Sequence, residues 1–325
     1  MHPAFSVIFL TTLIGAGQGL YLALYTGQFY SAFKVLPVQD SANYYVLGSL
    51  IVLVLLVAGL VASFFHLGRP ERAWRSAARW RTSWLSREVI VLPAFTGAVA
   101  AWGLIHYLGW NPHLFTFGDA YEIDLSLLVG AAATLLCFTL FLCTGMIYAC
   151  IKMLQEWATP LTVVNYTVLG ISSGFILATA FAAWQGSPLV DFFGGWAIFA
   201  TIVAFATRTA SLVRNARIKH KSTLESAIGI RHARIKQISQ GAMAGSFNTR
   251  EYFHGISQPK YRFVKWVFLV LAFPVPLVLL SIGLSTQVTS LLFGAFLVQY
   301  LGLLAERWFF FAQANHPQNL YYQTV

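Results

Sequence analysis

Residues 66–88 read HLGRPERAWRSAARWRTSWLSRE and separate two long apolar runs, residues 43–65 and 89–108. The stretch contains six arginines and four tryptophan or histidine rings. Each flanking run can cross a hydrocarbon layer roughly 30 Å thick, because an α-helix rises about 1.5 Å per residue. We therefore expect residues 66–88, called the shelf below, to be a short charged and aromatic loop that joins two membrane helices at the membrane surface.

The composition of the whole chain supports a membrane protein. Apolar residues make up 58% and charged residues 10% of the 325 residues, which lies outside the range of soluble domains. The net charge of +10 does not indicate nucleic-acid binding, because the basic residues lie in loops between apolar runs. The cysteines 137, 143 and 150 share one apolar segment without a Cys-x-x-Cys pair, so we expect small core residues and no metal site.

Hydropathy predicts an all-α integral membrane protein that forms one membrane domain over residues 1–325. The first apolar run has no basic leader and no short core before a cleavage site, so we expect it to be a retained span. Pro274 and Pro276 interrupt the seventh run, where we expect a kink. The eight predicted transmembrane helices are residues 4–33, 43–66, 87–108, 124–154, 162–185, 189–213, 264–285 and 287–312.

The basic residues predict the orientation of the helices. Of 21 Lys and Arg, six lie between Arg69 and Arg87 and twelve between Arg208 and Lys265, whereas residues 109–123 have none. The connections between helices two and three and between helices six and seven should therefore be cytoplasmic, which also places both termini in the cytoplasm. Lys34 is the exception to this assignment.

Two similar six-residue segments suggest an internal duplication. Ser83-Trp84-Leu85-Ser86-Arg87-Glu88 resembles Ser246-Phe247-Asn248-Thr249-Arg250-Glu251, and the two segments are four helices apart. The pattern is compatible with two four-helix units, although one short match also arises by chance. Asn248 and Glu251 have the spacing of a helix N-cap, so a short helix is expected there.

The connection between helices six and seven, residues 214–263, is long and basic. We interpret it as a docking surface for a partner protein. A solvated loop held near anionic lipid headgroups is the alternative, and both can be true.

Ionisable residues are nearly absent from the middle of the helices, which argues against a proton pump or an ion-coupled transporter. A haem b needs two axial ligands at matching depth. His66 and His106 end neighbouring helices on opposite sides of the membrane and cannot share one iron, although His2 could approach the depth of His66. We therefore expect no haem.

The shelf has the components of a quinone site. A quinone headgroup needs hydrogen-bond donors at two carbonyl oxygens, and its reduction takes up two protons with two electrons. His66 can donate and exchange a proton, and Glu88 can serve the other oxygen. The same residues are also explained by helix dipoles and interfacial anchoring, and physical reasoning alone does not separate these readings.

The motif His66-Leu67-Gly68-Arg69-Pro70, followed by Ser83-Trp84-Leu85-Ser86-Arg87-Glu88, resembles the signature of membrane anchor subunits of the dimethyl sulfoxide reductase type (DmsC-like). The resemblance covers most of the chain. It implies an anchor that holds a molybdopterin catalytic subunit and an iron–sulfur subunit at the membrane and exchanges electrons with a quinone, either ubiquinone or menaquinone. The quinone-binding residues it predicts are His66, Gly68, Arg69, Trp84, Ser86, Arg87 and Glu88. The residues we expect to dock the partner subunits are Arg72, Arg75, Arg231, Arg234, Lys236 and Arg250.

Two later segments, residues 245–251 and 314–322, resemble the anchors of cytoplasmic sulfite-oxidising, quinone-reducing molybdoenzymes (SoeC-like) within this group. This resemblance implies electron flow from sulfite into the quinone pool at the bacterial inner membrane. Two alternatives remain at this point. One is an anchor of an S- or N-oxide reductase that oxidises quinol, and the other is a transporter or membrane protein without a redox role.

Overall fold

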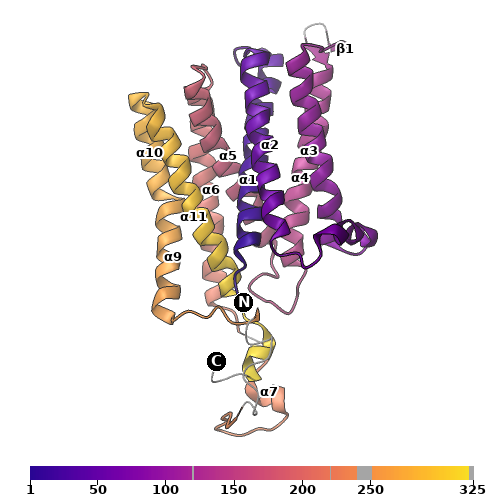
Figure 1. The fold of residues 1–325 in the computed structure, drawn as a ribbon. Helices are drawn as coiled ribbons and strands as arrows, with labels where there is room; N and C mark the ends of the chain where they lie inside the picture. The colour runs from indigo at the N-terminus through magenta and orange to yellow at the C-terminus, as the bar shows by residue number, and fades with distance from the viewer. Residues whose placement is uncertain (119–120, 220, 240–250, 322–325) are drawn as a thin grey trace.

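The computed structural model describes residues 1–118, 121–219, 221–239 and 251–321. Within these ranges, eight helices are long and apolar enough to cross a membrane, and they stand side by side (Figure 1). The spans are α1 (Phe5–Ala32), α2 (Val46–Phe64), α3 (Trp84–Leu108), α4 (Leu125–Ala149), α5 (Pro160–Trp184), α6 (Val190–Ala216), the pair α9 (Gln258–Ala272) and α10 (Pro274–Thr286), and α11 (Thr289–Gln313). The predicted all-α membrane architecture is confirmed.

Short elements occupy the two ends of the bundle. These are the π-helical turn η1 (Ser41–Tyr45), the 3-10 helices η2 (Pro70–Arg79) and η3 (Pro317–Tyr321), the helix α7 (Leu224–Ile228), and the antiparallel strands β1 (His113–Phe117) and β2 (Tyr121–Asp124). The shelf, α7, η3 and the start of the chain lie at one end, which we call the basic end, and the β1–β2 hairpin lies at the other (Figure 1). This sidedness agrees with the distribution of basic residues in the sequence.

The helices pack as two groups of four with the same order of contacts. In the first group α1 contacts α2, α2 contacts α3, α3 contacts α4, and α4 returns to α1. In the second group α5 contacts α6, α6 contacts α10, α10 contacts α11, and α11 returns to α5. The groups meet along α1 and α5, the first helix of each. This arrangement agrees with the two four-helix units suggested by the sequence.

Small residues allow α1 and α5 to approach closely. Gly15 and Gly19 of α1 face Gly170 and Gly174 of α5, and a Cβ added to Gly174 would lie 2.0 Å from the carbonyl carbon of Gly19. Both pairs have the Gly-x-x-x-Gly spacing that lets membrane helices cross with their backbones in contact. The centre of the molecule is therefore a backbone-to-backbone crossing of the two groups.

Two helix boundaries differ from the hydropathy pattern by more than three residues. Helix α4 ends at Ala149 instead of residue 154, because the apolar residues beyond it, such as Leu154 and Trp157, pack into a looped cluster at the basic end. Helix α9 begins at Gln258 instead of residue 264, because its first turns carry basic residues that a hydropathy count excludes. The predicted kink is confirmed at Phe273, which precedes Pro274. The helix start expected at Asn248 lies outside the described residues.

Candidate functional site

The shelf is folded onto the start of α3 by Arg87. Ser83 caps α3 by accepting a hydrogen bond from the Ser86 N–H at 3.3 Å. The Arg87 guanidinium donates to the carbonyl oxygens of Trp80 and Arg81, both at 2.9 Å, and lies 4.2 Å from the centre of the Trp84 ring. Part of the motif that resembles the DmsC signature therefore builds the loop itself.

The outer surface of the shelf is charged and aromatic. Trp74 is 71% exposed, and the Arg75 guanidinium lies 5.6 Å from its ring. Arg72 pairs with Glu71 at 3.7 Å in an exposed position. Gly68 and Arg69 are exposed, and a Cβ on Gly68 would meet open space. This surface at the basic end is accessible to lipid headgroups or to a partner protein.

His66 and Glu88 lie at the same end of neighbouring helices but have different surroundings. His66 follows the end of α2, and much of its side chain is exposed. The part of the imidazole that is shielded from water lowers its pKa below the ordinary value, because desolvation disfavours the charged form. Glu88 points from α3 toward α4, where the Thr144 hydroxyl donates a hydrogen bond to its carboxylate. Among the described residues, no hydrogen bond joins His66 to Glu88. The His66 imidazole therefore lies at the surface, whereas the Glu88 carboxylate points into the bundle.

Glu88 lines a small cavity between α1, α3, α4 and α5. The cavity has a volume of about 10 Å³. Its polar lining consists of Thr11, Gln18, Glu88, Thr144 and Tyr166. Neither Thr144 nor Tyr166 was predicted as a site residue. Threonine and tyrosine are common in apolar helices, so the sequence did not single these two residues out. Their positions opposite Glu88 depend on how the helices pack.

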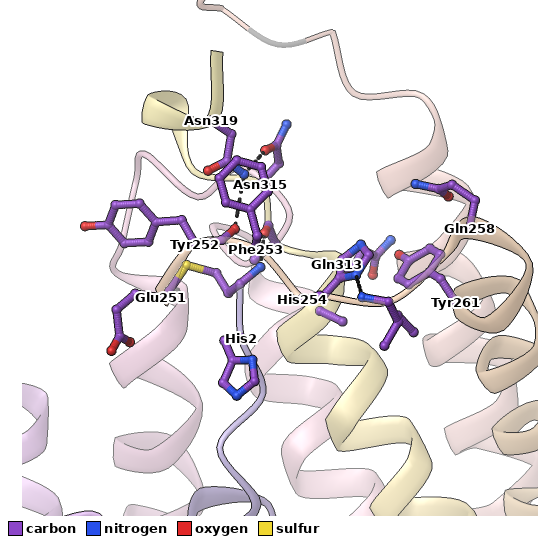
Figure 2. Close-up of a pocket in the computed structure, with 15 residues that line it drawn as sticks. His2, Glu251, Tyr252, Phe253, His254, Gln258, Tyr261, Gln313, Asn315 and Asn319 are labelled. Atoms are coloured by element: carbon purple, nitrogen blue, oxygen red, sulfur yellow. Dashed lines mark hydrogen bonds between the residues drawn. The ribbon is translucent and has the colours of Figure 1, made fainter. Parts of the chain in front are cut away.

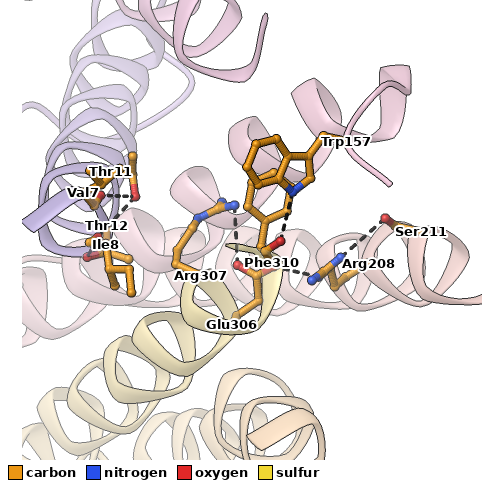
Figure 3. Close-up of polar contacts among 10 residues, drawn as sticks. All are labelled: Val7, Ile8, Thr11, Thr12, Trp157, Arg208, Ser211, Glu306, Arg307 and Phe310. Atoms are coloured by element: carbon orange, nitrogen blue, oxygen red, sulfur yellow. Dashed lines mark hydrogen bonds and ion pairs between the residues drawn. The ribbon is translucent and has the colours of Figure 1, made fainter. Parts of the chain in front are cut away.

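A buried ionic cluster of Arg208, Glu306 and Arg307 joins α6 and α11 (Figure 3). The Arg208 Nε atom of α6 is 2.7 Å from Glu306 Oε1 of α11, and Arg307 Nη1 is 3.5 Å from Glu306 Oε2. All three side chains are at most 5% exposed. The Arg307 guanidinium lies 3.6 Å from the centre of the Tyr166 ring. The cluster joins α5, α6 and α11 at the basic end.

Tyr252, next to the first segment with the SoeC-like resemblance, contacts the second segment at His316 and Asn319. Residues 245–250 lie outside the described residues. The Tyr252 and His316 rings stack with centroids 3.8 Å apart, and the Asn319 side-chain amide donates to the Tyr252 carbonyl oxygen at 3.2 Å. The His2 N–H donates to the Glu251 carbonyl oxygen at 2.8 Å. Residues at the start of the chain, between Glu251 and Tyr261, and in the tail from Ala312 to Asn319 border a cavity of about 980 Å³ at the basic end (Figure 2). The start of the chain, the long connection and the tail thus form one surface.

His106 belongs to a separate polar cluster at the opposite end. The Trp102 indole N–H donates to Gln28 Oε1 at 2.9 Å, and Gln28 Nε2 donates to Ser126 Oγ at 2.8 Å and lies 3.3 Å from His106 Nε2. A cavity of about 440 Å³ opens there toward the hairpin. His66 and His106 thus lie at opposite ends of the bundle, as the helix order predicts.

The predicted docking residues are exposed where the structure describes them. Arg72 and Arg75 lie on η2, whereas Arg231, Arg234 and Lys236 follow α7. The predicted docking residue Arg250 lies outside the described residues.

Comparison with known proteins decides the family. The family model described as "DMSO reductase anchor subunit (DmsC)" matches residues 1–313. The chain belongs to the DmsC family. The sulfite dehydrogenase of Allochromatium vinosum has a subunit that is 58% identical over 325 residues, and the alignment covers all of both chains. The DmsC-like resemblance and its SoeC-like refinement are both confirmed. In this DmsC-family anchor, the shelf motif lies at the basic end of the bundle.

Proposed function

We propose that this DmsC-family membrane anchor binds a quinone headgroup between the shelf and the start of α3 and passes electrons to it from an iron–sulfur subunit. The electrons would come from sulfite oxidised by a cytoplasmic molybdopterin subunit. Support comes from the 58% identity to a protein named as a subunit of sulfite dehydrogenase. His66 follows the end of α2 and Glu88 lies in the first turns of α3, so the two residues flank the shelf, and this placement carries the assignment of the site.

The residues present fit a quinone by their chemistry. His66 offers a ring N–H near the surface, and Glu88 offers a carboxyl group from inside the bundle. Phe65 is 83% and Leu85 51% exposed, so the surface near both donors is apolar. A flat ring with an isoprenoid tail matches this mixture of two polar groups and apolar surface.

Each residue of the site has a separate task. A bound quinone supplies two-electron chemistry and takes up two protons on reduction. His66 donates a hydrogen bond at one oxygen and exchanges protons with water, because it is exposed. Glu88 serves the second oxygen, and Thr144 fixes the direction of its carboxylate. Arg87 holds the shelf against α3 so that both donors keep their positions.

The basic end would face the bacterial cytoplasm, with both termini on that side and the chain in the inner membrane. The excess of Lys and Arg in the connections at this end supports that orientation. The iron–sulfur subunit would dock over the shelf and residues 214–263. Protons would enter from the cytoplasm, so this step would move little net charge across the membrane.

The opposite direction of electron flow, from quinol to an S- or N-oxide, uses the same site. The identity to a sulfite dehydrogenase subunit favours quinone reduction. Membership of the anchor family disfavours a transporter without a redox role.

The experiment uses the purified complex and two electron acceptors. His66→Ala and Glu88→Gln are expected to leave the complex assembled, to impair turnover with a quinone analogue, and to spare turnover with a soluble dye. His113→Ala and Glu122→Gln at the hairpin end are the matched controls. Loss of both activities with loss of assembly would indicate an anchor without a quinone site, and unchanged quinone turnover would refute the proposal.

A further inference from the structure

The cavity beside Glu88 has the size and lining of a single water site. Its volume is about 10 Å³, and one water molecule needs a cavity of roughly 10–15 Å³ measured this way. Such a site also needs two to four polar partners. The side chains of Glu88, Thr144, Tyr166, Gln18 and Thr11 line the space. Buried apolar cavities stay dry, but this one is polar on several sides.

Tyr166 contributes a second buried polar group to the lining of this cavity. Its side chain is 4% exposed and its hydroxyl is buried. The Tyr148 hydroxyl lies close enough to interact with it, but no described residue forms a hydrogen bond of good geometry with it. Buried hydroxyl groups are nearly always hydrogen-bonded, to protein or to ordered water. The Tyr148 ring stacks on Tyr166 with centroids 5.5 Å apart, which fixes the ring in place.

The charge next to Tyr166 favours donation by its hydroxyl. The Arg307 guanidinium lies 3.6 Å from the ring centre, and a cation over a phenol ring makes its O–H a stronger donor. Glu88 is an acceptor on the other side of the cavity, already oriented by Thr144. A water molecule between them can accept from Tyr166 and donate to Glu88.

We propose that one water molecule occupies this cavity and links the Glu88 carboxyl group to the Tyr166 hydroxyl. Tyr166 and Thr144 are then positioning residues, because they act on a bound quinone through Glu88. This inference rests on the proposed function of Glu88. It connects the quinone site of the first helix group to α5 of the second.

The test is infrared difference spectroscopy of the whole complex as its quinone is reduced. The Glu88 band is the carboxyl C=O stretch that disappears in Glu88→Gln. Tyr166→Phe is expected to shift this band to higher frequency and to lower the kcat with a quinone analogue roughly tenfold, the effect of one lost hydrogen bond. The KM should change little, because Tyr166 does not touch the quinone. Tyr300→Phe removes a phenol that lies 3.1 Å from Thr12 outside this cavity, and it should leave the Glu88 band unchanged.

A second measurement needs no variant at Tyr166. In the wild-type complex, exchange into H₂¹⁸O should shift a water O–H band in the difference spectrum, and that band should be absent in Glu88→Gln. An unshifted spectrum, or an unchanged Glu88 band in Tyr166→Phe, overturns the water site. If Glu88→Gln keeps full quinone turnover, the proposed function itself fails. If Glu88→Gln loses that turnover while Tyr166→Phe behaves as wild type, the water inference alone fails.

Discussion

Glu306 lies between two buried guanidinium groups, and its removal should destabilise the protein more than removal of either arginine. The Glu306 carboxylate is 2.7 Å from Arg208 and 3.5 Å from Arg307, and none of the three is more than 5% exposed. Their formal charges sum to +1. Glu306→Gln raises the sum to +2 and leaves two cations without a carboxylate, whereas Arg208→Met lowers it to zero and keeps the pair with Arg307.

Breaking a buried pair by removing one partner costs about 3–5 kcal/mol. We expect Glu306→Gln to lie in this range, because two cations lose their partner at once. Arg208→Met should cost about 1–2 kcal/mol, since it loses one charged hydrogen bond but substitutes an apolar side chain of similar length. Glu306→Gln should be the more destabilising of the two variants, because it leaves the larger net charge buried.

Thiol labelling of detergent-solubilised protein measures both variants. Cys137 and Cys143 are buried and react when the bundle opens, whereas the exposed Cys150 is first replaced by serine. One tenfold change in rate corresponds to about 1.4 kcal/mol, so Glu306→Gln should speed labelling by roughly 10²- to 4 × 10³-fold. Arg208→Met should speed it by roughly tenfold. Equal rates for the two variants, or the reverse order, would refute this account of the cluster.

Three further predictions concern packing, pH and docking. Gly174→Ala should cost about 1–3 kcal/mol in the same assay, because its Cβ would meet the backbone of Gly19; Gly97→Ala, with nothing within 4 Å, should cost nothing. Quinone turnover should rise as the pH falls through a midpoint below 6.5, because burial lowers the pKa of His66 and the imidazolium donates the proton. A midpoint above pH 6.5, or the same rise of turnover at low pH in the His66→Gln variant, would contradict the assignment of this pH dependence to His66. Charge reversal at the exposed basic residues that follow α7 should reduce co-purification of the soluble subunits, whereas Lys34→Glu at the other end should not; equal retention would exclude them from the docking surface. These residues are Arg231, Arg234 and Lys236.

The spans and the sidedness of the bundle could be predicted from the sequence because both depend on local composition. Each span contains a long apolar stretch, and most basic residues lie in or beside two connections that the fold brings to the same end. The Phe273 kink follows from Pro274 for a local reason as well, since proline lacks the backbone N–H that would continue the helix. The β1–β2 hairpin was not predicted, because residues 109–123 were identified only as a loop.

The pairings inside the bundle could not be predicted, because they join helices far apart in the sequence. Arg208 and Glu306 lie near the ends of two apolar helices, where charges are ordinary, and their contact depends on how α6 and α11 pack. Likewise, Glu88 was predicted from the motif, but its partner Thr144 is one hydroxyl among many in apolar helices. The sequence could therefore indicate which shelf residues to examine, but not which residues surround them.

The proposed quinone site lies between the shelf and the start of α3. The most direct test is photolabelling of the complex with an azido-quinone, followed by mapping of the modified peptides. If a quinone binds there, we expect adducts within residues 64–69 and 84–88 that unlabelled quinone competes away and that are lost in Glu88→Gln. Adducts confined to the cavity at the opposite end, lined by Gln28 and His106, would contradict it.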